Sequence, residues 1–269
     1  MENFNNKRFV QTLKWSALDS KKEIMSNLTI LFAVLLAPQL CYILASMNVD
    51  ADVAALGLKS VSAISNMALA FYISIGGCWI FNNMKTKQQR ITFKMLPASD
   101  LEKFLVRLLY VSVFWALSGF AVFVVMDLVR MLICLAVYHD FLFSSTVGLF
   151  GWFGFQPQFA MPLYADSALS VLSLSLYVWG HAFYTLGGAV FRRRPFVFTL
   201  LASFLLGMVV LMILANLMPL FVTSFSFNPS VWTIYAVAAV FFLASVVFYW
   251  LSDRIFRRMQ IINNKWLNL

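Results

Sequence analysis

The chain has 269 residues, of which 62% are hydrophobic and 12% are charged, against about 25% charged residues in soluble domains. This composition and a mean hydropathy of +0.82 exclude a water-soluble protein and predict an all-α polytopic membrane protein with a single transmembrane domain, residues 1–269. The formal net charge of +9 would favour nucleic acid as the partner of a soluble protein. In a membrane protein, binding of basic residues to membrane lipid explains this positive charge better, and we expect no nucleic-acid binding.

Residues 1–26 are basic and aromatic, and they predict an amphipathic helix that lies in the membrane interface. An apolar stripe recurs every four residues, beside a lysine and a tryptophan. Such stripes, flanked by basic residues, are typical of helices at anionic membrane surfaces. A solvated tail is the alternative, although it would expose several apolar anchors to water. The stripe consists of Phe9, Leu13 and Ala17, with Lys14 and Trp15 beside it.

Six apolar segments within residues 27–251 approach or exceed the ~20 residues that a transmembrane helix needs. The first contains Pro38, which is expected to kink it. The third is followed by a further apolar run that ends at residue 137. The predicted spans are residues 27–47, 60–81, 104–125, 168–191, 196–217 and 231–251, and residues 252–269 form a polar tail.

Lys and Arg residues are distributed unevenly between the two sides that six spans define. All twenty except Lys59 and Arg130 lie in the N-terminal region, in segment 82–107, in the connection after the fourth span or in the tail. Positively charged segments near transmembrane helices stay in the cytoplasm. The sequence therefore predicts an N-in, C-in orientation, with segment 82–107 in the cytoplasm.

A long polar interruption, residues 82–107, separates the second span from the third. Pro97 keeps the residue before it out of the α region, and Ser99 is a favourable N-cap residue. Glu102 follows Ser99 by three positions, which is the spacing of a capping box. The sequence therefore predicts an extended stretch, residues 95–99, that leads into a short, charged, capped cytoplasmic helix where a soluble partner could bind.

The sequence carries no motif of an enzyme. It has no GxxxxGK[ST] phosphate loop and no HExxH, and its two histidines, His139 and His181, lie far apart. The three cysteines lie in apolar runs without metal-ligand spacing, so neither a metal site nor a disulfide is expected. We therefore expect no catalytic activity and no cofactor in this chain.

Three ionisable residues lie in the predicted apolar helices. Asp127 and Arg130 are three positions apart on one helical face. They could form a site in a translocation path, but we favour an ion pair at the outer headgroups. In the second case, the substitution Asp127→Asn should have little effect. His181 lies in a span with Gly187 and Gly188, which allow close helix approach; it is either a proton or ligand site or, as is commoner, forms a hydrogen bond across a helix contact.

Two predicted outer segments carry little or no charge. Residues 138–166 are rich in Phe and Gly, and we expect short helices or a half-inserted loop at the outer interface. An apolar substrate or an outer-side partner could bind there, but interfacial packing is the simpler interpretation. Residues 219–229 carry no charge and could dip partly into the bilayer.

The sequence K-M-L-P-A-S-D-L-E-K-F-L at residues 94–105, between the second and third of six spans, resembles a segment of the ABC-2 type permease family. That family carries Leu-Pro-x-Ser at this place, with a basic residue several positions later. Residues 4–23 are similar to its amphipathic entry helix, and residues 219–229 resemble its re-entrant outer element. The long aromatic segment 138–166 departs from the family pattern.

The resemblance implies one transmembrane subunit of an exporter. Two such subunits, identical or different, would pair with two cytoplasmic ABC ATPase subunits, which hold the ATP and Mg²⁺. Segment 94–103 would be the coupling segment that docks on the ATPase, with the N-terminal helix as a second contact, and ATP-driven closure would open a path between the two halves. The implied coupling residues are Leu96, Pro97, Ala98, Ser99, Asp100, Leu101, Glu102 and Lys103, the last two setting the register of the dock.

Two other functions fit the same sequence. A secondary transporter or channel without an ATPase would need ionisable or broken-helix sites at mid-membrane, and the spans offer few beyond His181 and Pro38. A membrane scaffold or assembly subunit could use segment 82–107 to bind some other protein. A membrane-embedded enzyme ranks below both, and the substrate is not determined by the sequence.

Overall fold

The structure is a computed structural model that describes residues 4–84, 86–140, 142–150, 163–224 and 231–259. All regular secondary-structure elements among these residues are helices. In this part of the chain, six helical stretches are long and apolar enough to cross a membrane. This confirms the predicted α-helical class, and the six apolar helices are in line with a multi-pass membrane protein.

The elements follow the chain order that the apolar segments predict. Those of the first half are α1 (Asn6–Asp19), α2 (Lys21–Ala45), α3 (Ala51–Ile75), the short helices η1 (Gly76–Trp79) and η2 (Asn82–Met84), α4 (Lys87–Lys94) and α5 (Asp100–Leu109). Those of the second half are the π-helical turn η3 (Tyr110–Phe114), α6 (Trp115–Tyr138), α7 (Ser145–Phe150), α8 (Leu163–Val190), α9 (Pro195–Ser224) and α10 (Val231–Arg258).

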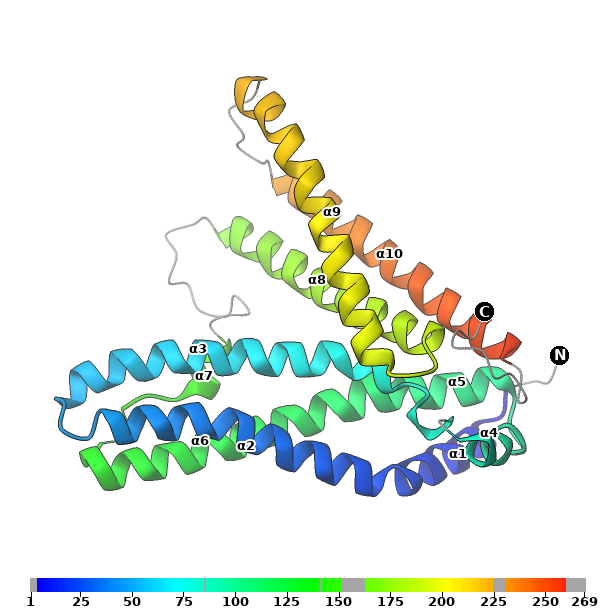
Figure 1. Cartoon of the computed structure of the whole chain (residues 1–269), viewed down its shortest axis with the longest axis horizontal. Helices are drawn as coiled ribbons and strands as arrows, with labels where there is room; N and C mark the ends of the chain where they lie inside the picture. Colours follow the sequence, from blue (N-terminus) through cyan, green and yellow to red (C-terminus); the bar gives the residue numbers. More distant parts are fainter. Residues whose placement is uncertain (1–3, 85, 141, 151–162, 225–230, 260–269) are drawn as a thin grey trace.

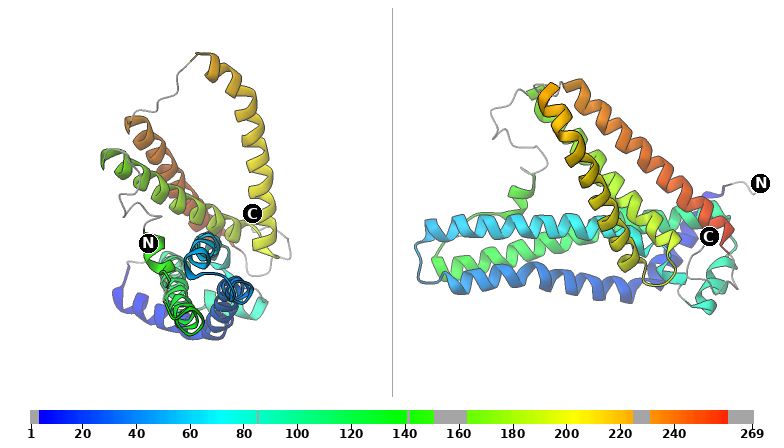
Figure 2. Two further views of the ribbon diagram at one scale, coloured as in Figure 1. Left: turned by 90° about the vertical axis from the view of Figure 1, so that its left-hand side faces the viewer. Right: turned by 45° about the horizontal axis from the view of Figure 1, so that its top comes forward.

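The long helices form two groups that meet near one end of the molecule (Figures 1 and 2). In the first group, α2, α3 and α6 lie side by side along the long axis, and each contacts the other two. In the second group, α8 packs along α10, while α9 contacts α8 and diverges from it (Figure 1). Because α8 also contacts α3 and η1, the end of α3 links the two groups.

Glycines allow this close contact where α3 ends. A Cβ atom on Gly77 would lie 2.7 Å from the amide nitrogen of Thr185 and 2.8 Å from the carbonyl oxygen of His181, both in α8. A Cβ atom on Gly188 would lie 2.7 Å from the carbonyl oxygen of Cys78. Only glycine leaves room for backbone contacts of this kind. The predicted close approach at Gly188 is therefore present, and its partner is η1.

The third span is part of a longer, continuous helix. α5, η3 and α6 run without a break from Asp100 to Tyr138, so the helix begins four residues before the predicted start of the span at Phe104. The indole N–H of Trp115, just after the π turn, donates to the carbonyl oxygen of Tyr72 in α3 (3.1 Å), and the two rings stack at 4.9 Å. The charged start of α5 and the apolar α6 thus belong to one element.

Helix α1 forms where an amphipathic N-terminal helix is predicted, but a different face of it is buried. Thr12 and Ser16 are buried, whereas Ala17, part of the predicted stripe, is exposed. The ring of Trp15 stacks on Phe93 of α4 at 6.0 Å. The reason is that α1 packs against α5, which offers it polar partners. Of the predicted interfacial residues, Phe9, Leu13 and Trp15 are half-buried and Lys14 is exposed.

The basic segments gather toward one end of the molecule. α1, α4, the start of α5 and the end of α10 lie at this end, and the connection from α8 to α9 lies toward it (Figure 1). Together with the start of α2, they contain all Lys and Arg residues of the described ranges except Lys59 and Arg130. The charge asymmetry on which the predicted orientation depends is therefore an asymmetry between the two ends of the fold.

The predicted outer segments are described only in part. Residues 145–150 form α7, in line with the expectation of short helices in segment 138–166, and residues 151–162 lie outside the described ranges. α9 continues to Ser224 rather than ending at residue 217, so the first part of segment 219–229 is helical. Residues 225–230 and the tail beyond residue 259 also lie outside the described ranges.

Candidate functional site

The predicted coupling segment is the turn between two capped helices. The capping box predicted at the start of α5 is present: the Glu102 amide donates to Ser99 Oγ (3.2 Å) and the Ser99 amide to Glu102 Oε2 (2.8 Å). A second capping box starts α4, where Gln89 and Thr86 exchange the same pair of bonds. The sequence analysis missed α4, although Thr-x-x-Gln has the same readable spacing.

Lysine side chains close the turn between α4 and α5. Lys103 Nζ donates to the carbonyl oxygen of Lys94 (2.8 Å), one of the carbonyl groups that the end of α4 leaves without a helical partner. Lys94 Nζ in turn lies 3.3 Å from Asp100 Oδ1 and 3.3 Å from the carbonyl oxygen of Phe256 in α10. The α4–α5 unit is therefore held both internally and against the end of the last helix.

Glu102 also fixes the start of α1. The side chain is fully buried, and its Oε1 accepts hydrogen bonds from the Asn5 amide (2.7 Å) and from Arg8 Nη2 (3.4 Å). Both carboxylate oxygens are thereby used within this chain. A buried carboxylate is stable only when its oxygens are bonded in this way, so Glu102 requires α1 to lie where it does.

Arg107, one turn and a half further along α5, fixes the other end of α1. Its guanidinium donates to the carbonyl oxygens of Ile80 (Nε, 2.7 Å) and Trp79 (Nη2, 3.2 Å), where the second span ends. Nη1 donates to the hydroxyl groups of Ser16 (3.1 Å) and Ser20 (3.3 Å), at the junction of α1 and α2. The side chain is 1% exposed. Sequence analysis assigned it no role beyond its charge.

The residues that remain exposed define a contact surface, which we call the tip: Met95, Pro97 and Leu101. Met95 is 76% exposed and Leu101 is 41% exposed. Glu102 and Lys103, which the resemblance assigns to the dock, are buried and bonded within the chain. Of the other implied coupling residues, Ala98 is buried, and Leu96, Ser99 and Asp100 are half-buried.

Asp127 and Arg130 form the predicted ion pair, but they are buried within the fold. Arg130 Nη2 lies 2.8 Å from Asp127 Oδ1 and also donates to the Phe143 carbonyl oxygen. The carboxylate accepts four further bonds at the start of α7, from the amides of Ser145 and Thr146 and from the hydroxyls of Ser144 and Thr146. The predicted ion pair is therefore present, and it caps the start of α7 within the fold.

His181 joins three elements. Its Nε2 lies 3.2 Å from the carbonyl oxygen of Val111 in η3, and its Nδ1 lies 2.8 Å from the hydroxyl of Tyr249 in α10. A carbonyl oxygen only accepts, so Nε2 carries the proton and Nδ1 accepts from the tyrosine. Both ring nitrogens are occupied by contacts between helices, in line with the commoner of the two interpretations.

Comparisons with protein-family models, with curated proteins and with solved structures find no match to this chain. Among the described residues, no group of three His, Cys, Asp or Glu side chains is placed to hold a metal ion. The candidate functional site is the α4–α5 unit, which is anchored to α1, to α10 and to the third span.

Loss of Glu102 should loosen α1 more than loss of its neighbour Asp100. The Glu102→Ala variant leaves the amides of Ser99 and Asn5 without an acceptor, and we expect its free energy of unfolding to fall by about 2–3 kcal/mol. Asp100→Ala removes a half-exposed carboxylate from the same turn and should cost less than about 1 kcal/mol. Thermal unfolding in detergent and limited proteolysis of α1 would measure both. Equal losses would show that the bonds of Glu102 do not hold α1.

The Asp127→Asn variant should be destabilised, in contrast to the expectation for an exposed headgroup pair. The substitution removes an acceptor oxygen from the start of α7 and leaves the Arg130 charge buried, which should cost about 3 kcal/mol or more. Asp52→Asn, at an exposed position in the first turn of α3, is the matched control. Unfolding temperatures within 1–2 °C of each other, roughly the shift of a minor surface change, would contradict the capping role.

Proposed function

We propose that this chain is the transmembrane permease subunit of an ATP-binding-cassette exporter, driven by a separate ATPase that docks on segment 94–103. The observation that carries the proposal is the continuity of α5 with α6. A force applied at the tip reaches the third span through unbroken helix, without a flexible loop between them. A helix transmits such a displacement because its backbone hydrogen bonds resist bending.

The anchoring of the α4–α5 unit supports the same proposal. Because Glu102 and Arg107 bind α1, and Lys94 binds the end of α10, a displacement of the tip would move these elements together. Contacts to the first, third and sixth spans would follow, since α1 leads directly into α2. The small apolar tip suits a soluble partner that binds reversibly, as the coupling segment of an exporter must.

The orientation proposed is N-in, C-in in the bacterial inner membrane. The end of the fold that carries α1 and α4 also carries nearly all basic residues of the described ranges, and cationic segments are retained in the cytoplasm. The ATPase, with its ATP and Mg²⁺, would bind at this end. The apolar walls of the spans favour a lipidic or amphiphilic substrate.

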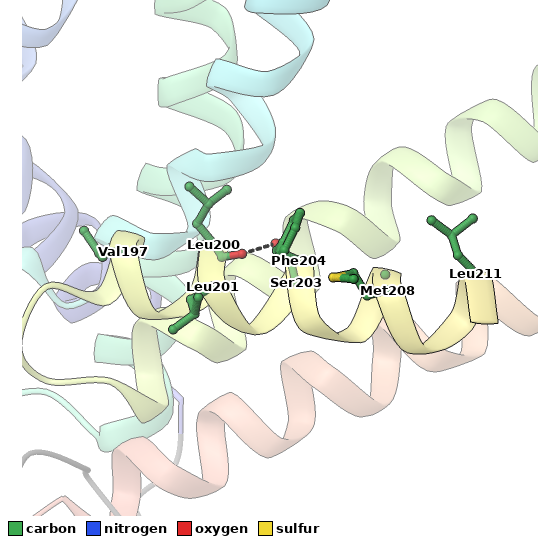
Figure 3. Close-up of a pocket in the computed structure, with 8 residues that line it drawn as sticks. Val197, Leu200, Leu201, Ser203, Phe204, Met208 and Leu211 are labelled. Carbon is green, nitrogen blue, oxygen red and sulfur yellow. Dashed lines mark hydrogen bonds between the residues drawn. The ribbon is translucent and has the colours of Figure 1, made fainter. Parts of the chain in front are cut away.

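A second permease subunit would pack on α9. Among the six apolar stretches of the described part, α9 buries the smallest share of its residues. Figure 3 shows the side chains of α9 that line one apolar pocket, among them Leu201, Phe204 and Met208, and all three of these side chains are exposed. A second copy of the chain would cover this face and place two sets of spans around a shared path.

The first test is to purify the full chain from its native host in mild detergent and identify what is bound. The proposal expects a stoichiometric ATP-binding subunit. A partner that binds no ATP would favour a membrane scaffold, and a protein that is purified alone yet transports substrate would favour a secondary transporter.

The double variant Met95→Asp/Leu101→Asp should lose the bound ATPase and all ATP-driven transport, while its unfolding temperature stays close to that of the wild type. Both side chains are exposed, so charges there disturb the contact surface and leave the fold intact. Leu96 is less suitable, because it packs against the buried cluster around Phe93.

The control variant is Gln88→Asp/Thr92→Asp, on the exposed face of α4. It adds the same charge and should keep both the bound ATPase and ATP-driven transport. Transport by the Met95→Asp/Leu101→Asp variant would refute the coupling role.

A cysteine at position 207 should crosslink two copies of the chain in the membrane. Apart from its chain neighbours and the nearby backbone of its own helix, no atom of the described residues lies within 4 Å of a Cβ atom built on Gly207, so the monomer should tolerate the substitution. The variant Gly207→Cys, made in a background without Cys41, Cys78 and Cys134, should form a disulfide-linked dimer on mild oxidation. Leu117→Cys, exposed on α6, is the control and should remain monomeric. A monomer at both positions would exclude pairing of identical copies through α9.

A further inference from the structure

A cavity of about 660 Å³ lies between the end of the second span and the connection from α8 to α9. Four arginines line it. Arg90 comes from α4, and Arg192, Arg193 and Arg194 come from the connection, so side chains about a hundred positions apart in sequence converge on one space. No Asp or Glu is among the described residues that line the cavity.

Arg90 is the unusual member of this group because it is buried. It is 6% exposed, and its Nε donates to the Thr86 carbonyl oxygen (3.4 Å). Burial, and secondly the positive charge of Arg192, lower the pKa of the Arg90 guanidinium. An arginine stays charged in proteins, so two cations face each other across a partly desolvated space. A bound anion would relieve this repulsion.

Two further features of the cavity favour an anion. Pro195, Phe196 and Val197, which form the first turn of α9, line it. Pro195 has no N–H, but the amides of Phe196 and Val197 have no acceptor within the helix, and the positive end of the helix dipole lies here. Arg194, immediately before this turn, has a φ of 49°, in the left-handed region that L-residues rarely adopt.

Apart from Asn82, the remainder of the lining is apolar or aromatic. Trp79, Phe81, Phe191 and Met259 contribute, beside the first residues of α9. These apolar side chains would not stabilise a free inorganic anion, whereas they could pack against the glycerol and acyl region of a lipid. The cavity also lies toward the end of the spans where basic residues gather, which is the level of headgroups in the proposed orientation.

We propose that this cavity binds the phosphate group of an anionic membrane lipid, with Arg90 and the 192–194 arginines around the phosphate and the aromatic residues against its glycerol and acyl region. Guanidinium groups form paired hydrogen bonds with phosphate oxygens, and basic pockets between transmembrane helices at the cytoplasmic side are suited to lipid headgroups. The bound lipid would join α4 to the connection between α8 and α9. The proposal does not require that the chain be an exporter.

Native mass spectrometry of the full-length chain in detergent tests the proposal with three probes: phosphatidylglycerol, phosphatidylcholine with the same acyl chains, and inorganic phosphate. We expect one tightly held phosphatidylglycerol per chain and weaker retention of phosphatidylcholine. Inorganic phosphate in excess should neither bind stably nor raise the unfolding temperature. If the chain binds both lipids equally, the cavity recognises acyl chains and not the anionic headgroup. If inorganic phosphate raises the unfolding temperature as much as phosphatidylglycerol does, the cavity is a site for free anions. Either result would overturn the proposal.

Two variants locate the lipid on the arginines. Arg90→Gln keeps the 192–194 triplet, so the membrane topology is preserved, and it should weaken phosphatidylglycerol binding about fivefold. The triple variant Arg192→Gln/Arg193→Gln/Arg194→Gln should weaken it by roughly a hundredfold, the product of three such steps.

The matched control is Lys7→Gln/Lys21→Gln/Lys22→Gln, which removes three exposed charges from the same end of the molecule and should leave the affinity nearly unchanged. If this control loses as much affinity as the arginine triple variant, the effect is general surface charge. If Arg90→Gln binds phosphatidylglycerol as tightly as the wild type, the cavity is not the site.

Discussion

The structure of the basic end depends on two buried charges, Glu102 and Arg107, which lie five positions apart on α5. A buried ion is tolerated only when hydrogen bonds replace the water it has lost. Glu102 obtains them from its own helix start and from the beginning of α1, and Arg107 obtains them from the end of the second span and from the α1–α2 junction. Neither residue can be satisfied by α5 alone. The position of α1 is therefore a consequence of these two side chains.

This arrangement separates the residues that hold the α4–α5 unit from those that can meet a partner. The polar side chains Glu102 and Lys103 face inward and are used for anchoring, while apolar Met95 and Leu101 face outward. Because α5 continues into α6, the tip is mechanically part of the third span. A soluble protein bound there would act on the membrane helices directly, whichever partner it is.

Three ionisable residues of the long helices, Asp127, Arg130 and His181, join different elements of the fold. Asp127 and Arg130 cap α7 against the first group of spans, and His181 connects α8 to α10 and to the π turn. Where the two groups of helices meet, Gly77 and Gly188 allow direct backbone contact. Each of these contacts joins residues that are close in space but far apart in the sequence. They explain how a chain with so few charged residues maintains a specific helix arrangement.

Local patterns in the sequence determined the helical class, the six apolar spans and the capping box of Ser99 and Glu102, because each depends only on residues a few positions apart. The Thr86–Gln89 box was equally local and could have been found in the same way. Tertiary structure alone decided the second role of Glu102, whose partner Asn5 is 97 positions away, and which face of α1 is buried. It also decided that Asp127 caps a later helix. Such partners are set by how the packed helices bring distant segments together, and no spacing in the sequence records that.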